Sequence, residues 1–238
     1  MSWTAFHPLT RIAIVLCVIF ATASLAGWDR VGNALANMSP RGSFDNRCAE
    51  LPANAIDVEL RPLTVHEDRS EPFVSLARMT RDASPGHRTV GVTQANFGHR
   101  SVVDSKGIED RQNLRACLRP RVHVELFVQP LTVYIASEYA ADPCRSRVIR
   151  EHEERHVQVF REFAREAAAR LSADLARSVG NAPHFAMTLE EAQRDVDRRL
   201  AETLATFMRD AERTLAERQA SVDTPAEYQR VGNACNAG

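Results

Sequence analysis

Hydrophobic and polar residues alternate with a period of two through the first half of the chain, from about residue 56 to residue 140. The segment IDVELRPL places Ile56, Val58 and Leu60 on one face, and RTVGV is a shorter strand candidate. The strongest pattern is RVHVELFVQPLTVYIASEY, whose apolar face continues beyond Pro130. Alternation of this kind is typical of strands with one buried face. It predicts an antiparallel meander, with loops in TRDASPGHR and NFGHRSVVDSKGIEDRQN.

The period changes after the residues ADPC. Residues 146–179 and 188–220 carry apolar side chains at helical spacing, separated by GNAPHFAMT. Gly180 suits the position just after a helix, and Thr188 followed by glutamate three residues later forms a capping box. Two long helices joined by a short link form an antiparallel hairpin. The fold class that we expect is therefore α+β, an antiparallel β-sheet meander followed by a long antiparallel helical hairpin.

The N-terminus has the features of a signal peptide. An apolar run, IAIVLCVIFATASLA, follows Arg11, and the small residues Ser24 and Ala26 precede Gly27. The run is shorter than the roughly 20 apolar residues of a transmembrane helix. We therefore expect cleavage after residue 26, no stable membrane anchor unless the segment stays uncleaved, and a periplasmic or secreted bacterial protein.

The rest of the chain divides by its patterns into a lead-in and one domain. The lead-in is rich in Gly, Asn, Ser and Pro and has no clear periodicity. The domain that follows is long enough for its own hydrophobic core. The expected boundaries are 27–55 for the loosely structured lead-in and 56–238 for the domain, made of a sheet (56–142), a helical hairpin (143–220) and a disulfide-tied tail (221–238).

Charge and cysteine content narrow the possible functions. The net charge of −1 gives no electrostatic footprint for nucleic acid. Four cysteines remain after the signal peptide, none of them in a C-x-x-C pair, and an even number in an exported chain suggests two disulfides. Because the second helix returns toward the start of the first, we expect a Cys144–Cys235 bond, which leaves Cys48–Cys117 by elimination.

The segment REHEERHVQVF contains an H-E-x-x-H motif, formed by His152, Glu153 and His156. At about 100° per residue both histidines share the apolar stripe of the first predicted helix. Side chains four residues apart meet on one face of a helix, as two ligands of one metal ion must. In this interpretation the histidines bind Zn²⁺, and Glu153 acts as general base toward a zinc-activated water without binding the metal. The alternative is a packed, hydrogen-bonded pair of core histidines without a metal.

At these residues the chain resembles a known class of enzymes. A sheet followed by a C-x₇-HEERH helix in an exported chain is similar to the zincin metallopeptidases, and more narrowly to bacterial families of predicted secreted zinc-dependent proteases of unknown function. The resemblance covers residues 120–160 best. It implies zinc on the two histidines and Glu153 as general base. The chain departs from metzincins, because Val159 and Glu162 stand where their motif continues with Gly and His.

A catalytic zinc site needs a third protein ligand. If the two helices fold about a turn near residue 183, position 156 lies opposite about 210, which makes Asp210 the first candidate. The same geometry brings the tail close to the site, so Asp223 is the next candidate, followed by Glu227 and Tyr228. Glu191 would lie roughly 30 Å away along the helices.

The leading functional hypothesis is an exported zinc metallopeptidase that acts on a peptide or protein substrate. An extended peptide would pair with a strand beside the motif helix, and RVHVELFV or LTVYIAS is the expected edge. His123 with Glu125 on one strand face is a further ligand candidate, although a surface pair is the simpler interpretation. The alternative function is a non-catalytic envelope metal-binding or interaction protein with a vestigial H-E-x-x-H motif.

Overall fold

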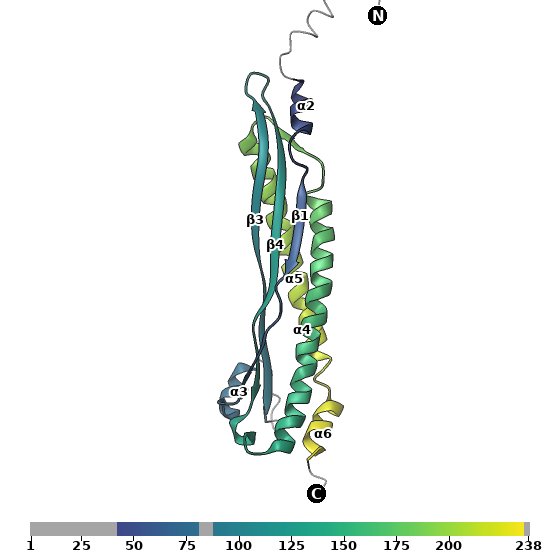
Figure 1. The fold of residues 1–238 in the computed structure, drawn as a ribbon. Coiled ribbons are helices and arrows are strands. Elements are labelled where there is room, and N and C mark those ends of the chain that lie inside the picture. Colours follow the sequence, from purple (N-terminus) through teal and green to yellow (C-terminus); the bar gives the residue numbers. More distant parts are fainter. Residues whose placement is uncertain (1–41, 81–87, 236–238) are drawn as a thin grey trace, which may run out of the picture. The chain divides into compact units, whose positions relative to one another are not determined.

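The structure is a computed structural model that describes residues 42–80 and 88–235 (Figure 1). The expected signal peptide and residues 27–41 of the lead-in lie outside the described residues. The chain divides into two compact units at the junction between Ala49 and Glu50. Helix α2 (Phe44–Ala49) belongs to the first unit, and all other described helices and strands belong to the second.

The second unit is built around one long central strand, β4 (Arg115–Ile135). Strand β3 (Gly91–Asp110) pairs with it in an antiparallel hairpin over almost its whole length. Along the other side of β4 lie three short strands in line: β5 (His184–Ala186), which is antiparallel to β4, and β1 (Ala55–Leu60) and β2 (Val65–Asp68), which are parallel to it. The expected α+β class is confirmed, and the sheet is mostly antiparallel, although the parallel pairing of β1 and β2 with β4 departs from the antiparallel meander that we expected.

Strand β3 covers most of the segment that we expected to be a loop. Its many polar residues, such as Arg100 and Asp104, are exposed, so the segment lacks a continuous apolar face. Two of its glycines leave room for bulky neighbours. A Cβ at Gly98 would lie 2.7 Å from the ring of Phe127, and one at Gly107 would lie 2.4 Å from Leu189. Glycines that signal a loop in the sequence thus mark close packing within a strand.

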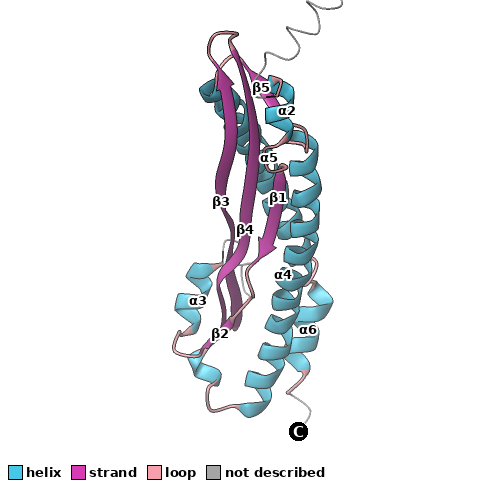
Figure 2. Cartoon of the chain, turned by 45° about the horizontal axis from the view of Figure 1, so that its top comes forward, coloured by secondary structure: helices cyan, strands magenta, loops and turns pink. Residues whose placement is uncertain are grey.

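The helical half follows the expected hairpin. Helix α4 (Pro143–Ser178) and helix α5 (Leu189–Ala220) lie side by side along the sheet (Figures 1 and 2). Gly180 has the positive φ of 76° that ends a helix, and the Thr188 hydroxyl accepts a hydrogen bond from the Glu191 amide at 3.1 Å. A third helix, α6 (Pro225–Asn233), lies in the segment expected as a tail. The remaining elements are α3 (Phe73–Met79) and a 3₁₀ turn, η1 (Ser137–Tyr139).

The core lies between one face of the sheet and the two long helices. Its larger cluster joins β1 and β4 to α4 and α5, and includes Val124, Leu126, Leu171 and Val196. A second cluster lies beside the H-E-x-x-H motif and contains Ile149 and Val157, which flank the motif on α4. Each fully buried aliphatic side chain contributes about 1.5–3 kcal/mol. This packing fixes the face that α4 turns to the sheet, and with it the directions of the motif side chains.

The structure contains the disulfide that we expected between Cys144 and Cys235. Cys144, at the start of α4, is bonded to Cys235, which follows α6. Cys48 and Cys117 are also in disulfide form. Two disulfides suggest an extracellular or periplasmic protein. Within the part of the chain that the structure describes, no helix combines the length and the apolar content needed to cross a bilayer.

Candidate metal centre

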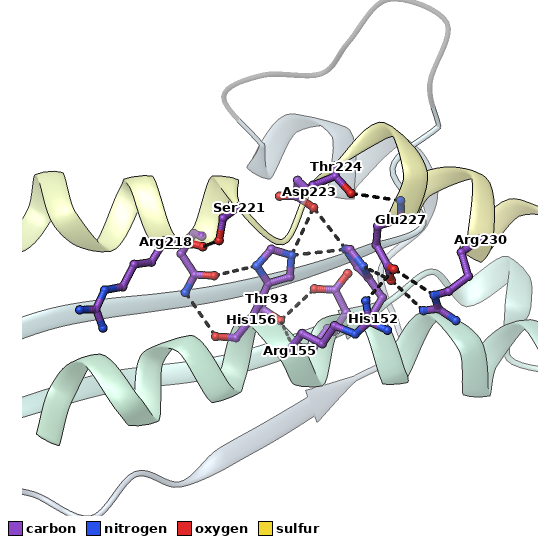
Figure 3. A network of polar contacts seen from close by, with 12 residues as sticks. Thr93, His152, Arg155, His156, Arg218, Ser221, Asp223, Thr224, Glu227 and Arg230 are labelled. Carbon is purple, nitrogen blue, oxygen red and sulfur yellow. Dashed lines mark hydrogen bonds and ion pairs between the residues drawn. The ribbon is translucent and has the colours of Figure 1, made fainter. Parts of the chain in front are cut away.

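His152 and His156 lie one turn apart on α4 with 7% and 9% of their surfaces exposed. Their Nε2 atoms are 3.3 Å apart. Asp223, in the turn between α5 and α6, places its Oδ1 atom 3.3 Å from each of these nitrogens. Figure 3 shows the three side chains converging on one point. Among residues 42–80 and 88–235, these three form the one group of potential ligands that is close enough to hold a metal ion.

The second nitrogen of each imidazole is held by a hydrogen-bond acceptor. His152 Nδ1 lies 3.1 Å from Glu227 Oε1, and His156 Nδ1 lies 2.7 Å from Gln219 Oε1. The Gln219 amide is oriented by its own nitrogen, which donates to the His156 carbonyl at 3.3 Å. Each Nδ1 therefore carries the proton, and each Nε2 of the neutral ring has a free lone pair. Two nitrogen lone pairs and a carboxylate oxygen then face one another, an arrangement that a cation stabilises.

Glu227 is kept ionised by two arginines. Its carboxylate accepts hydrogen bonds from Arg155 at 2.6 Å and from Arg230 at 2.7 Å. The Arg230 hydrogen bond is the largest influence, and together with those from His152 and Arg155 it outweighs desolvation and lowers the pKa of Glu227 to about 2. An ionised carboxylate is the stronger acceptor for the His152 Nδ1 proton. The arginines thus act on the site through Glu227 (Figure 3).

The pKa values of the two ligand histidines are raised in the metal-free protein. Burial by itself lowers them, because it disfavours the charged imidazolium. The hydrogen bonds with Asp223 and the negative charge of Glu153 outweigh burial, so the net pKa of both His152 and His156 is higher than usual. The carboxyl of Asp223 responds in the opposite direction, and these histidines hold its pKa far below the usual value. The site therefore attracts positive charge, either as protons or as a metal ion.

Glu153 projects from α4 toward the sheet and does not belong to the ligand group. Its Oε2 atom accepts a hydrogen bond of 2.8 Å from the hydroxyl of Thr93 on β3. A Cβ at Gly91 would lie 2.5 Å from Glu153 Oε1, so the absence of a side chain there makes room for the carboxylate. Burial, which leaves 3% of the residue exposed, raises the pKa of Glu153. The result is a carboxylate with a proton affinity above the usual, close to two metal ligands in sequence and in space.

Tyr228 completes the surroundings at the exposed rim. Its hydroxyl is hydrogen-bonded to Asp223, and its ring centroid lies 6.2 Å from that of His152. Desolvation, followed by the charge of Asp223, raises the pKa of Tyr228 to about 12. The phenol therefore keeps its proton at physiological pH and serves as a donor, and 46% of the residue is exposed.

Asp210, the first candidate for the third ligand, lies away from the site. It pairs with Arg213 at 2.8 Å and lines a groove between α4 and α5 that also includes Arg170 and Phe207. The reason is the register of the helical hairpin. His156 contacts Gln219, so the axis of the hairpin falls midway between these two residues, at 187–188, and not at 183. The link contains strand β5, which pairs with β4 and moves the start of α5 along the chain.

The other candidates are also placed by the structure. Asp223, the second choice, offers the third potential ligand atom, and Glu227 is hydrogen-bonded to Nδ1 of His152. The carboxylate of Glu191 accepts a hydrogen bond from the Met187 amide at the far end of α5. His123 pairs with Asp57 at 2.9 Å on the surface. Gln219 and Thr93 had no signal of their own in the sequence, because their roles arise from contacts with residues 63 and 60 positions away.

The expected substrate edge requires a correction. RVHVELFV and LTVYIAS both lie in β4, which is paired with β3 on one side and with β1 or β2 on the other. Its backbone groups are therefore used within the sheet. Strand β3 is paired with β4 alone among the described strands, and it carries Thr93 beside Glu153. The open edge near the motif thus belongs to β3.

Comparison of the chain with protein-family models, curated proteins and solved structures finds no match, so the interpretation of this site rests on its residues and their geometry.

Proposed function

We propose that this protein is a zinc-dependent hydrolase, and most specifically a peptidase, with zinc held by His152, His156 and Asp223. The observation that carries the proposal is the triangle of ligand atoms with edges of 3.3 Å. In a tetrahedral zinc site with bonds of about 2.0–2.1 Å, neighbouring ligand atoms are about 3.3–3.4 Å apart. An octahedral site with bonds of about 2.1 Å would bring adjacent ligands to about 3.0 Å.

The chemistry of the donors supports zinc over the common hard cations. Calcium and magnesium prefer oxygen ligands, whereas two of these three donors are imidazole nitrogens. Both imidazoles have acceptors at Nδ1, from Glu227 and Gln219, and such partners orient metal-binding histidines and increase their basicity.

Three protein ligands leave the fourth position of a tetrahedron for water or substrate, as in catalytic zinc sites. Solvent reaches the group through Asp223, whose side chain is 36% exposed, whereas the two histidine side chains are almost fully buried. Glu153 does not belong to this group of ligands, so it does not fill the fourth position. The arrangement therefore favours an open coordination position.

Bound zinc would lower the pKa of a water molecule to near neutrality. Glu153 then has the role of general base. Burial raises the pKa of Glu153, so this carboxylate binds a proton more readily than an ordinary glutamate does. Thr93 fixes one carboxylate oxygen and leaves Oε1 for proton transfer. Tyr228 keeps its phenolic proton and can donate to an oxygen that becomes negative as a carbonyl is attacked.

A peptide is the substrate class that suits the surrounding backbone. Among the described strands, β3 is paired with β4 alone and carries Thr93, and an extended chain can pair with the other edge of β3 through main-chain hydrogen bonds. The second candidate function is a non-catalytic envelope metal-binding protein, favoured by the deep burial of Glu153 at 3% exposure. The two functions differ in whether the carboxylate reaches a substrate.

The proposal is tested by comparing Glu153→Gln with Glu154→Gln. Glu154 is the next residue but lies on the exposed side of α4, where it pairs with Arg161 at 2.5 Å. Glu153→Gln should leave the zinc content unchanged and reduce cleavage of a broad peptide library by at least about 10²-fold, because the general base is lost. Glu154→Gln should retain both. Zinc-loaded wild type that cleaves no peptide would favour the binding protein, and full activity of Glu153→Gln would overturn the mechanism.

A further inference from the structure

Helix α6 has little apolar attachment to the rest of its unit. Its buried residue is the charged Glu227, and Tyr228 is half exposed. A helix of nine residues is not stable by itself in water. Polar and covalent ties to α4 therefore help to hold it in position.

Those ties are the candidate metal centre and a disulfide. Before α6, Asp223 contacts His152 and His156, and in its first turn Glu227 binds His152 and Arg155. After α6, Cys235 is bonded to Cys144 at the start of α4. The same short segment thus carries a metal ligand, the carboxylate behind another ligand, and a disulfide cysteine. Whatever releases one tie weakens the others.

The disulfide that follows α6 is more accessible to thiol–disulfide exchange than the disulfide of Cys117 is. Cys144 and Cys235 are both partly exposed, whereas Cys117 has no exposed surface. Thiol–disulfide exchange requires a thiolate to reach one of the sulfur atoms, and exposed disulfides are the more readily reduced. A dithiol reductant should therefore open Cys144–Cys235 before it reaches the disulfide of Cys117.

We propose that the Cys144–Cys235 disulfide is a redox switch that controls the metal affinity of the His152–His156–Asp223 site. The inference rests on the metal site of the proposed function and is independent of its catalysis. A thiolate of a dithiol attacks one sulfur of the pair and the Cys144–Cys235 bond breaks, which forms a mixed disulfide. The second thiolate of the reductant displaces the remaining cysteine, so the reductant becomes a disulfide. Cys144 and Cys235 together gain two electrons and two protons.

Opening the disulfide should lower metal affinity through Glu227. Without the bond, α6 loses its covalent attachment to α4, and water can replace the polar contacts of Asp223 and Glu227. As α6 leaves its place, His152 loses the carboxylate at Nδ1, and Asp223 loses the helix that follows it. Loss of such an outer partner of a metal ligand typically weakens metal binding 10–100-fold. The oxidised protein is thus the form that holds the metal tightly.

The test measures the zinc dissociation constant of the full mature chain by competition with a chromophoric chelator. Cys144→Ser/Cys235→Ser replaces the disulfide without free thiols, which would themselves bind zinc. We expect binding 10–100-fold weaker than in the oxidised wild type. Mild reduction of the wild type, with the opened cysteines identified by alkylation, should label Cys144 and Cys235 first. Preferential labelling of Cys117 would overturn the proposal.

A double-mutant cycle decides whether the disulfide acts through α6. In Glu227→Ala the carboxylate is already absent, so adding the two serine substitutions should weaken zinc binding by less than about threefold more. A further loss as large as in the wild type would overturn this route. An oxidised wild type that binds no zinc overturns the metal site and the switch together. Tight zinc binding that is unchanged in the serine variant overturns the switch alone.

Discussion

Thr93 on β3 donates a hydrogen bond of 2.8 Å to the carboxylate of Glu153 on α4. This contact joins the sheet to the motif helix at the residue assigned as general base. The neighbouring histidines on α4 turn instead toward Asp223 and Glu227, which follow α5. Adjacent residues of the H-E-x-x-H motif are therefore positioned by different parts of the fold, and metal binding can be separated from proton transfer by mutation.

The first prediction is that Thr93→Val lowers activity and leaves zinc content unchanged. The substitution removes the donor to a buried carboxylate, and a hydrogen bond to a charged group is worth about 1.5–3 kcal/mol, or roughly tenfold or more in rate. The acidic limb of the pH–rate profile should also move to higher pH, because the ionised form of Glu153 loses its hydrogen bond. Thr203→Val is the control, since that hydroxyl bonds the Arg199 carbonyl on the exposed side of α5. Equal activity losses in both variants would contradict the assignment.

The second prediction concerns the third ligand. Asp223→Asn should weaken zinc binding by at least about tenfold, because the amide replaces a charged ligand with a neutral and poorer one. Asp210→Asn should bind zinc as the wild type does, since Asp210 pairs with Arg213 outside the site. Zinc titrations of the two variants side by side measure the difference. Weaker binding in Asp210→Asn alone would restore the ligand expected from the sequence.

The sequence could place His152 and His156 side by side, but it ranked Asp223 only second among their possible partners. His152 and His156 are four residues apart on one helix, so their proximity follows from helical geometry. The position of Asp223 depends on the register between the two helices. With the link that contains strand β5, Gln219 lies opposite His156 where the sequence placed residue 210, a shift of nine residues. At 1.5 Å per residue those nine positions amount to roughly 13 Å. Pairing of β5 with the tip of β4 is a contact across some 70 residues, which no local pattern contains.

The disulfide shows how a correct pairing can follow from an incomplete geometry. We expected Cys235 near Cys144 because the second helix was to end beside residue 146. In the structure α5 ends near the level of His156, and α6 continues in the same direction to bring Cys235 to Cys144. The capping residue Thr224 and Pro225 mark the start of α6 in the sequence, but the segment is too short for a clear helical pattern.

The third prediction is that Gly91→Ala is destabilising and impairs activity more than metal binding. The new Cβ would lie 2.5 Å from Glu153 Oε1 and 2.6 Å from Ile149. Overpacking of this kind typically costs about 1–3 kcal/mol. Relief of the contact requires Glu153 to leave its place beside Thr93, while the ligand histidines face away from β3. Thermal unfolding and zinc content, measured together with cleavage, should show lower stability, lower activity and about one zinc per chain. Loss of zinc without loss of activity would contradict the separation of roles.

The last prediction follows from the raised pKa values of His152 and His156. In the metal-free protein these imidazoles bind protons at higher pH than unperturbed histidine, and zinc must displace those protons. Zinc affinity should therefore fall as pH decreases through the raised pKa values. Asp223 adds no proton in this range, because its pKa is far below the usual value.

The folding stability of the metal-free protein depends on pH in the opposite direction to zinc affinity. The contribution of the two histidines is fully present below their unfolded pKa and is lost as pH rises through their folded pKa. The difference in melting temperature between zinc-loaded and chelated protein should consequently increase from pH 5.5 to pH 7.5. Calorimetric titrations in buffers of different ionisation enthalpy should detect a larger number of protons released per zinc near pH 6 than at pH 8. His66→Asn, a change at an exposed histidine on β2, should leave that number unchanged. Zinc binding near pH 6 without proton release would show that the imidazoles are not the ligands.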